Sequence, residues 1–140
     1  MCGIFAILNS CFNNKNIIHN FHKGVARGPE NSKLYTPFHK IIMGFHRLAI
    51  NGLDENSGQP MNIEDYVLIC NGEIYNHTFL EKISKLTMTT GSDCEIIIHL
   101  YKKYGIYQTL KMLDGVFAFV LLDKKKGKIF VARDCYGVRP

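Results

Sequence analysis

The sequence predicts an α+β fold in which antiparallel β-sheet carries helices on its faces. Strand-like segments come first, at residues 3–8 and 40–48, and helical segments and a terminal hairpin follow them. This order lacks the regular strand–helix alternation of a parallel sheet, so a Rossmann-type fold is disfavoured. A chain of 140 residues with 46% hydrophobic and 21% charged residues is typical of one globular domain.

Hydrophobic periodicity and turn residues predict the individual elements. Phe79, Leu80 and Ile83 share helical spacing, Ser92 or Asp93 is suited to cap the next helix, and a lysine run before Gly127 predicts a hairpin turn. In chain order we expect a buried strand at 3–8, a loop and short helix at 9–20, a turn at 27–30, a strand at 40–48, a polar loop at 51–60, a short strand at 66–70, helices at 76–86, at 93–104 and at 109–113, and strands at 116–122 and 128–132.

Composition excludes several classes of function. The net charge of +5 has no accompanying basic stripe with aromatic support, so no nucleic-acid partner is expected. No segment approaches the ~18 apolar residues of a membrane helix, and residues 1–8 lack the charged start of a signal peptide. Five irregularly spaced cysteines fit neither a metal site nor a disulfide framework. We therefore expect a cytoplasmic protein without a membrane partner or a bound metal.

Cys2 is the most informative single residue. Removal of Met1 would leave a thiol and a free α-amine on Cys2. An α-amine titrates at about 7.7–8.0 and a thiol at about 8.5, so the amine can accept the thiol proton near neutral pH. Cys2 would then be nucleophile and base at once. The alternative is an ordinary cysteine that happens to come second.

Asn71 and Gly72 follow an apolar strand-like segment. The side-chain amide of Asn71 and the backbone N–H of Gly72 are two donors that an oxyanion hole can use. A plain Asn-Gly hairpin turn is the alternative, and it is the commonest meaning of this dipeptide.

Three charged residues complete a set suited to an amino-acid substrate. Arg47 lies in a mostly apolar segment and can bind a carboxylate, either of a ligand or of an internal acid. Glu73 and Asp93 can each bind an ammonium group, or each can be a helix cap or a surface acid. With Cys2, these residues supply what the side-chain amide of an α-amino acid needs for hydrolysis.

Six ordered blocks resemble one family. They are Met1–Ile4, Arg27–Glu30, Gly44–Ala49, Asn71–His77, Leu113–Phe119 and Arg133–Pro140. The family is the class II glutamine amidotransferase domain of glutamine-hydrolysing asparagine synthetase, of the eukaryotic-like type. The resemblance covers nearly the whole chain.

The resemblance implies a fold, a reaction and residue roles. The fold is that of N-terminal-nucleophile hydrolases, with two stacked antiparallel sheets between helical layers. The reaction is hydrolysis of glutamine to glutamate and ammonia through a thioester on Cys2, without a cofactor. By motif position, Asn71 and Gly72 would form the oxyanion hole and Arg47 would hold the α-carboxylate. The remaining implied contacts to glutamine are from Glu73 and Asp93 to its α-amine and from backbone groups around Leu48 and Ile50.

The chain also departs from the family. Ala26 and Glu30 replace the usual His and Asp around Arg-Gly-Pro, and Ile50-Asn51-Gly52 replaces an apolar run that ends in Asp. The family domain continues with further strands and a synthetase domain that binds ATP, Mg²⁺ and aspartate. We therefore expect residues 1–140 to be a truncated glutaminase domain without the synthetase domain, and a homodimer remains open.

Two other functions remain as alternatives. One is another class II amidotransferase, such as glucosamine-6-phosphate synthase or the phosphoribosyl type. The other is a non-catalytic interaction module that keeps the same fold. An intact Met1 in the mature protein would favour the second, because it blocks the amine of Cys2.

Overall fold

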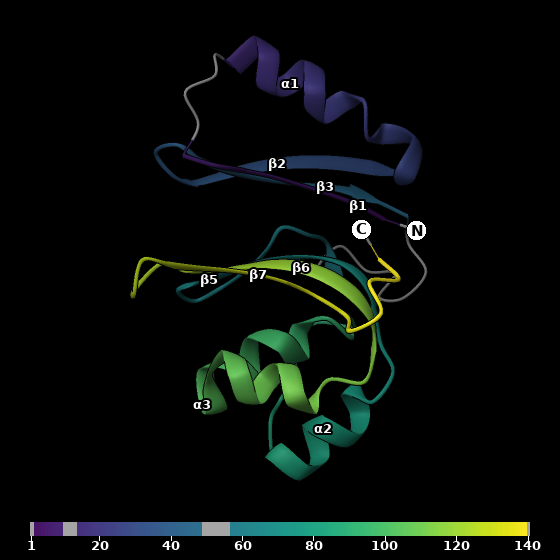
Figure 1. Cartoon of the computed structure of the whole chain (residues 1–140), viewed down its shortest axis with the longest axis vertical. Coiled ribbons are helices and arrows are strands. Elements are labelled where there is room, and N and C mark those ends of the chain that lie inside the picture. The colour runs from purple at the N-terminus through teal and green to yellow at the C-terminus, as the bar shows by residue number, and fades with distance from the viewer. Residues whose placement is uncertain (1, 10–13, 49–56, 140) are drawn as a thin grey trace.

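A computed structural model describes residues 2–9, 14–48 and 57–139 of the chain. It has four layers: a helix, two sheets and a pair of helices (Figure 1). The first sheet has three strands in the order β1-β3-β2, and the second has four in the order β4-β5-β6-β7. Helix α1 covers the outer face of the first sheet, and α2 and α3 cover the outer face of the second (Figure 1). The predicted α+β fold with two stacked antiparallel sheets is confirmed.

The helices and strands have the following bounds. They are β1 (Gly3–Leu8), α1 (Asn14–His22), a short 3-10 helix (Val25–Arg27), β2 (Asn31–Phe38), β3 (Ile41–Arg47), β4 (Met61–Ile63), β5 (Tyr66–Ile74), α2 (His77–Ser84), α3 (Glu95–Met112), β6 (Gly115–Asp123) and β7 (Lys128–Arg133). All strand pairs are antiparallel.

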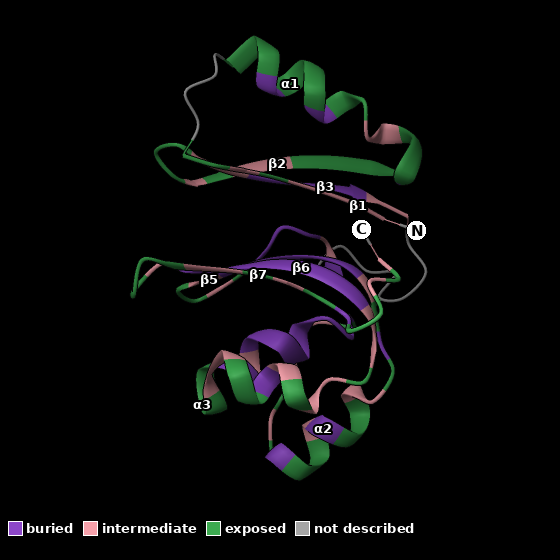
Figure 2. Ribbon diagram, viewed as in Figure 1, coloured by how far each residue is buried: buried purple, intermediate pink, exposed green. Residues whose placement is uncertain are grey.

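The core has two parts, one on each face of the four-stranded sheet. Alternation along β5 sends Val67 and Ile69 toward the first sheet, where they pack with Met43 and Phe45 of β3. The opposite face of β5 and β6 packs under α2 and α3 in a larger cluster that includes Leu68, Cys70, Leu80, Ile97, Tyr101, Phe119 and Leu121. Figure 2 shows these buried residues concentrated on the four-stranded sheet and the near face of α3.

Helix α3 contains the break that the sequence predicts. Gly105 has φ 77° and ψ 169°, which is not helical, so the element is two helical segments joined at a kink. The predicted caps are wrong, because the N-cap residue is Cys94 and no side chain caps the helix. The side chain of Asp93 instead accepts a hydrogen bond from the backbone of β5.

Two strands were not predicted from the sequence. β2 is largely exposed at the edge of its sheet and contains Pro37, so it has little of the apolar character that marks a strand. β4 has only three residues. The first strand, β1, is half-buried rather than buried, since it too forms an edge of its sheet.

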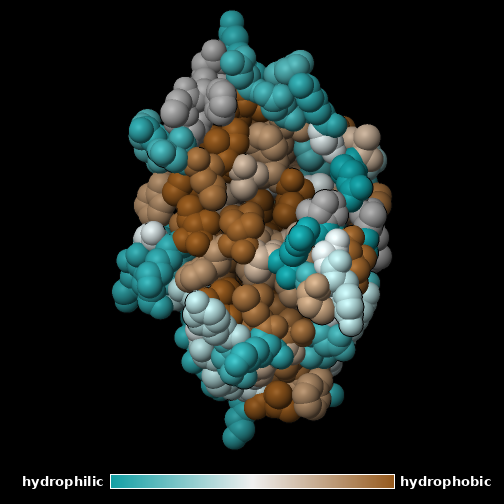
Figure 3. Space-filling model, in the orientation of Figure 1, coloured by the Kyte–Doolittle hydropathy of each residue, from teal (hydrophilic) through white to brown (hydrophobic). Residues whose placement is uncertain are grey.

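Strand β7 forms one edge of the four-stranded sheet. Within the described residues it pairs only with β6, and Val131 on it is 68% exposed. Figure 3 shows hydrophobic side chains gathered on this face of the molecule at the level of the two sheets.

Candidate functional site

One pocket, at the end of the molecule where the two sheets approach each other, collects the predicted site residues. Its walls come from both sheets and from the segments before α3 and after β7. Those of its lining residues that the sequence predicts are Cys2, Arg47, Leu48, Asn71, Gly72, Glu73 and Asp93. Ile50 and the unusual Asn51 lie outside the described residues.

Cys2 is held at the mouth of this pocket by strand pairing. Gly3 pairs with His46 across β1 and β3, so the register brings Cys2 next to the end of β3. The Cys2 Sγ lies 3.3 Å from the carbonyl oxygen of Leu48 and 3.5 Å from its backbone nitrogen. The predicted backbone contact of Leu48 is thus made to the thiol in this structure. Because Cys2 is only half-buried, a small molecule in the pocket can reach its sulfur.

The other two thiols of the pocket are less accessible than that of Cys2. Cys70 and Cys94 are buried and lie against each other in the wall. The contact with Cys70, together with burial, raises the pKa of the Cys94 thiol well above its usual value. A buried thiol with a raised pKa carries little thiolate and is inert. Cys2 is therefore the pocket cysteine best placed to react.

Asn71 and Gly72 lie inside strand β5 and not in a turn. They pair with Ala118 and Phe117 of β6, so the hairpin interpretation of this dipeptide is wrong. The strand continues to Ile74, beyond the predicted end at Cys70. Asn71 is only 3% exposed, and alternation places it on the face of β5 that looks toward the first sheet and Cys2.

The hydrogen-bonding pattern of β5 directs the N–H of Gly72 into the pocket. The N–H and C=O of Phe117 both bond to Asp134, so they point away from β5. Gly72 and Phe117 therefore form a non-hydrogen-bonded pair, in which the N–H of Gly72 points away from β6.

The neighbouring N–H groups on that edge of β5 have side-chain partners. The N–H of Cys70 donates to Gln59 Oε1 at 2.6 Å, and that of Ile74 donates to Asp93 Oδ2 at 2.6 Å. Gln59 Nε2 also donates to the carbonyl oxygen of Cys70, so this side-chain amide bonds to Cys70 as the backbone of a neighbouring strand would. The N–H of Gly72 lies between these two and opens onto the pocket that both partners line.

Gly72 is required here because strands β5 and β6 approach closely. A Cβ atom at this position would overlap the carbonyl oxygen of Val116 and lie 2.5 Å from the Cα of Phe117. Neither is a flexible side-chain end, so a larger residue would push the strands apart. Such a shift would move the N–H of Gly72 and the side chain of Asn71 together.

The charged residues surround the same space. Arg47 is half-buried at the end of β3, and its carbonyl oxygen accepts the N–H of Glu30. Glu73 is exposed at the rim, whereas Asp93 is 6% exposed. Burial raises the pKa of the Asp93 carboxyl, and the hydrogen bond from Ile74 partly opposes this effect. The site residues predicted from the sequence thus bring one cation and two acids to the pocket, which suits a zwitterion.

The family departures at Ala26 and Glu30 lie on the surface. Both residues are exposed, and Glu30 takes part in the fold through its backbone N–H. Between them, Gly28 is buried so tightly that a Cβ atom would overlap the backbone of His46. The glycine of this block is therefore constrained by close packing against β3.

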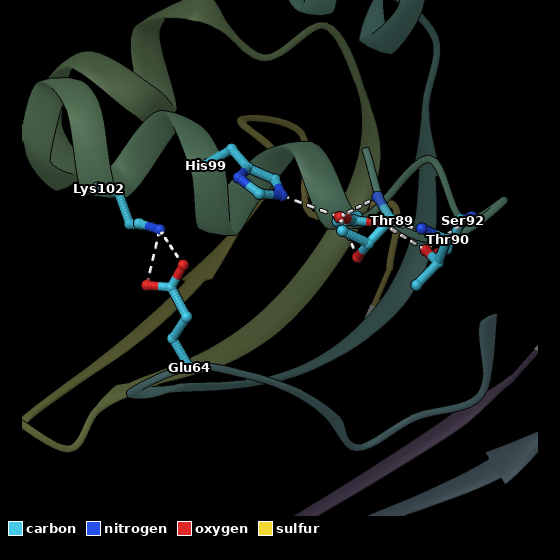
Figure 4. A network of polar contacts seen from close by, with 7 residues as sticks. Glu64, Thr89, Thr90, Ser92, His99 and Lys102 are labelled. Carbon is cyan, nitrogen blue, oxygen red and sulfur yellow. Dashed lines mark hydrogen bonds and ion pairs between the residues drawn. The ribbon is translucent and has the colours of Figure 1, made fainter. Parts of the chain in front are cut away.

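A buried carboxylate fixes the loop that carries Asp93. Glu95, with 0% of its side chain exposed, accepts hydrogen bonds from the backbone N–H and the hydroxyl of both Thr89 and Thr90, at 2.6–2.8 Å. Its Oε1 also lies 2.8 Å from His99 Nε2. Figure 4 shows His99, Thr89 and Thr90 converging on this group. Burial acts to raise the pKa of Glu95, but the hydrogen bonds from Thr90, His99 and Thr89 outweigh it and hold the pKa below its usual value.

We expect Glu95→Gln to destabilise the fold by about 2 kcal/mol or more, because the new NH₂ group faces N–H donors that then lose their acceptor. Ionised Glu95 stabilises the fold fully above about pH 4.3, its usual pKa, and this contribution is lost as the pH falls through the lower pKa of the folded state. The difference in the free energy of unfolding between wild type and Glu95→Gln should therefore become smaller at acidic pH. Urea unfolding at neutral and acidic pH measures both effects.

Glu64→Gln is the matched control. Glu64 is a surface acid whose carboxylate binds Lys102 at 2.7 Å, in the same view (Figure 4). The substitution Glu64→Gln should change the free energy of unfolding little, since exposed ion pairs contribute little to stability. Equal effects of the two substitutions would contradict the role assigned to Glu95.

Several lining residues were not predicted from the sequence. They are Phe45, Ser57, Gln59, Cys70, Ser92, Cys94 and Arg139. Ser57 accepts the N–H of Gly91 and so joins the two loops of the wall. Phe45 and Arg139 belong to the blocks Gly44–Ala49 and Arg133–Pro140, and Ser92 was a candidate helix cap, but none of the three was given a role in a site.

Two kinds of feature are absent from the described ranges 2–9, 14–48 and 57–139. No group of three His, Cys, Asp or Glu side chains there is arranged to hold a metal ion. No helix within these ranges is both long and apolar enough to cross a membrane.

Comparison with known proteins gives one consistent result. Residues 1–140 match the family described as "Glutamine amidotransferase domain". Proteins named "Asparagine synthetase [glutamine-hydrolyzing]" from Mesocricetus auratus and Homo sapiens are each 44% identical to the chain over 156 aligned positions, and the one from Gallus gallus is 42% identical over 153. Each alignment covers 100% of this chain but 26% of the relative, so the chain spans about a quarter of the relatives' length.

Proposed function

Because the chain belongs to the glutamine amidotransferase domain family, we propose that its pocket hydrolyses glutamine to glutamate and ammonia, with Cys2 as the nucleophile. One observation carries this proposal. Every predicted site residue within the described ranges lines a single pocket, although these residues come from the segment before β1, the end of β3, strand β5 and the segment before α3. Residues so far apart in sequence would not meet by chance around one accessible thiol.

The proposed chemistry begins with removal of Met1, which frees the α-amine of Cys2. The amine accepts the thiol proton, and the sulfur attacks the side-chain amide carbon of glutamine. The side-chain NH₂ of Asn71 and the N–H of Gly72 stabilise the negative charge that develops on the oxygen. The amine then donates its proton to the leaving nitrogen, ammonia departs, and a thioester remains on Cys2. Water hydrolyses the thioester and releases glutamate.

Binding of glutamine in this scheme relies on the charged residues. Arg47 holds the α-carboxylate, and Glu73 and Asp93 hold the α-ammonium. The step needs no cofactor, since the thiol, the amine and the two donors provide all its groups. The free state of the described cysteines, Cys2, Cys70, Cys94 and Cys135, supports a reducing compartment such as the cytoplasm.

We further propose that the ammonia serves the ATP-dependent conversion of aspartate to asparagine. The names of the relatives support this acceptor, and the blocks that match them extend along the whole chain. The sites for ATP, Mg²⁺ and aspartate would belong to a synthetase domain, to which residues 1–140 contribute the ammonia source. A sugar-isomerase or phosphoribosyl domain attached to this chain would contradict the choice.

Intact-mass spectrometry after treatment with a glutamine-like electrophile, such as a diazo ketone analogue of glutamine, tests the proposal. We expect loss of Met1 and one covalent adduct, mapped to Cys2. Pretreatment with excess glutamine should slow the labelling. An active protein that keeps Met1 would contradict the mechanism, because the amine of Cys2 would then be part of a peptide bond.

Arg47→Ala should raise the KM for glutamine by about 10- to 100-fold with a smaller change in kcat, because a charge-assisted contact that is present before and during reaction is lost. Steady-state kinetics of ammonia release measures the split. Lys33→Ala is the matched control, since Lys33 is an exposed cation of β2 that lines a neighbouring cavity with Arg47 but not the glutamine pocket. An unchanged KM in Arg47→Ala would remove the carboxylate role.

A further inference from the structure

The segment after β7 forms a wall of the pocket, and one buried carboxylate organises it. Asp134 is 5% exposed, and its two oxygens accept four backbone N–H groups. Oδ1 accepts those of Tyr136 and Val138 at 3.1 and 3.0 Å, and Oδ2 accepts those of Phe117 and Arg139 at 3.2 and 3.3 Å. The hydrogen bond from Val138, together with the others, holds the pKa of Asp134 below its usual value. The carboxylate is therefore the centre of the turn.

This turn also has a backbone built for a tight reversal. Gly137 has φ 63°, a left-handed conformation that glycine adopts without strain, and its N–H bonds to the carbonyl oxygen of Asp134. The N–H of Asp134 itself bonds to Phe117 of β6, the strand that pairs with Gly72. The turn is thus tied directly to the strand pair that carries the oxyanion donors.

The result is that Arg139 reaches the pocket of Cys2. Arg139 lines the same pocket as Cys2 and Arg47, although 137 positions separate it from Cys2 in the sequence. Figure 1 shows the segment after β7 returning to the end of the molecule where β1 begins. Two arginines, Arg47 and Arg139, therefore line the pocket, and glutamine itself has only one carboxylate.

The charges of the substrate and the product indicate what Arg139 binds. Glutamine brings one carboxylate and one ammonium, which Arg47 on one side and Glu73 and Asp93 on the other would hold. Hydrolysis creates a second carboxylate on the carbon that was bonded to Cys2. An arginine of the pocket wall binds this new anion far better than the neutral amide that it replaces.

We propose that Arg139 binds the side-chain carboxylate of the glutamate product, and that Asp134 is the positioning residue that holds Arg139 in the pocket wall. This assignment rests on the proposed function. It predicts that Arg139 controls the affinity for glutamate much more than the affinity for glutamine. Asp134 acts through the turn and touches neither ligand.

The test is a set of calorimetric titrations with glutamine and with glutamate, in a Cys2→Ala background that prevents turnover. Arg139→Gln should weaken glutamate binding by about tenfold or more and glutamine binding by less than about threefold. Arg139→Lys should recover part of the loss, because it keeps the charge but not the planar fork. Asp134→Asn should weaken glutamate binding in the same selective way.

Two comparisons separate positioning from general damage. Asp123 is also a buried carboxylate that accepts a backbone N–H, from Lys126 in the hairpin turn, but it is not in the pocket. Asp123→Asn should leave both affinities unchanged in the folded protein. The double variant Asp134→Asn with Arg139→Gln should bind glutamate no more weakly than Arg139→Gln alone, since Asp134 acts through Arg139.

The results of these titrations test the binding role of Arg139 and the positioning role of Asp134 separately. Equal losses for both ligands, or no loss in Arg139→Gln, would overturn the product-binding role while the glutaminase proposal stands. Selective loss in Arg139→Gln without loss in Asp134→Asn would overturn the positioning role. A parent protein that binds neither ligand would overturn the proposed function and this inference with it. If Asp134→Asn does not fold, Arg139→Gln and Arg139→Lys still decide the binding role.

Discussion

Cys2→Ala is expected to reduce ammonia release from glutamine to the uncatalysed background. The sulfur of Cys2 is the accessible thiol of the pocket, and the other two lining cysteines are buried. Without it no thioester can form, and an alanine methyl group offers no substitute nucleophile. A coupled glutamate or ammonia assay at saturating glutamine measures the loss, and glutamine binding should persist because the charged contacts remain.

Cys135→Ala is the control for this experiment. Cys135 is exposed and lies outside the pocket, so its removal should leave the rate unchanged. In a protein that also carries the synthetase part, Cys2→Ala should spare synthesis from free ammonia. A Cys2→Ala variant that still releases ammonia at a substantial fraction of the wild-type rate would exclude Cys2 as the nucleophile.

Asn71→Ala is expected to lower kcat by about 10²–10³-fold with little change in KM. Its side-chain NH₂ is one of the two donors that we assign to the oxyanion, and that charge exists only after the sulfur has attacked. Loss of a contact made only in the transition state lowers kcat and kcat/KM together. Steady-state kinetics with glutamine gives both constants.

Asn62→Ala provides a matched amide deletion on the neighbouring strand. Asn62 is an exposed residue of β4 whose side chain bonds to Lys124, away from the pocket. It should leave kcat unchanged. If Asn71→Ala raised KM and spared kcat, Asn71 would be a residue that binds the ground state, and the oxyanion role would have to be assigned elsewhere.

The sequence predicted the layers of the fold because buried elements leave a clear apolar pattern. Strand β6 is buried along most of its length and is a nearly continuous apolar segment, and the predicted helix end at Tyr104 lies next to the break at Gly105 in α3. Strand β2 was missed because its residues are mostly exposed and one is proline. Edge strands are stabilised by their neighbour's backbone, which leaves little trace in side-chain pattern.

The sequence predicted which residues form the site but not how they are arranged in space. Asn71-Gly72 has the composition of a turn, yet it continues β5 because β6 pairs with it along its whole length. Asp93 has the composition of a cap, yet its carboxylate serves the N–H of Ile74. Gln59 carried no signal, because a glutamine side chain that replaces a strand partner can be recognised only when the strand is seen.

The proposed nucleophile, Cys2, precedes the first strand, and the wall that contains Arg139 follows the seventh strand of the described residues. During translation these two parts leave the ribosome at opposite times, and no intermediate length of the nascent chain contains both. Glutamine hydrolysis should therefore begin only when the two sheets have docked on each other. A cell would in this way be protected from ammonia release by partly synthesised copies.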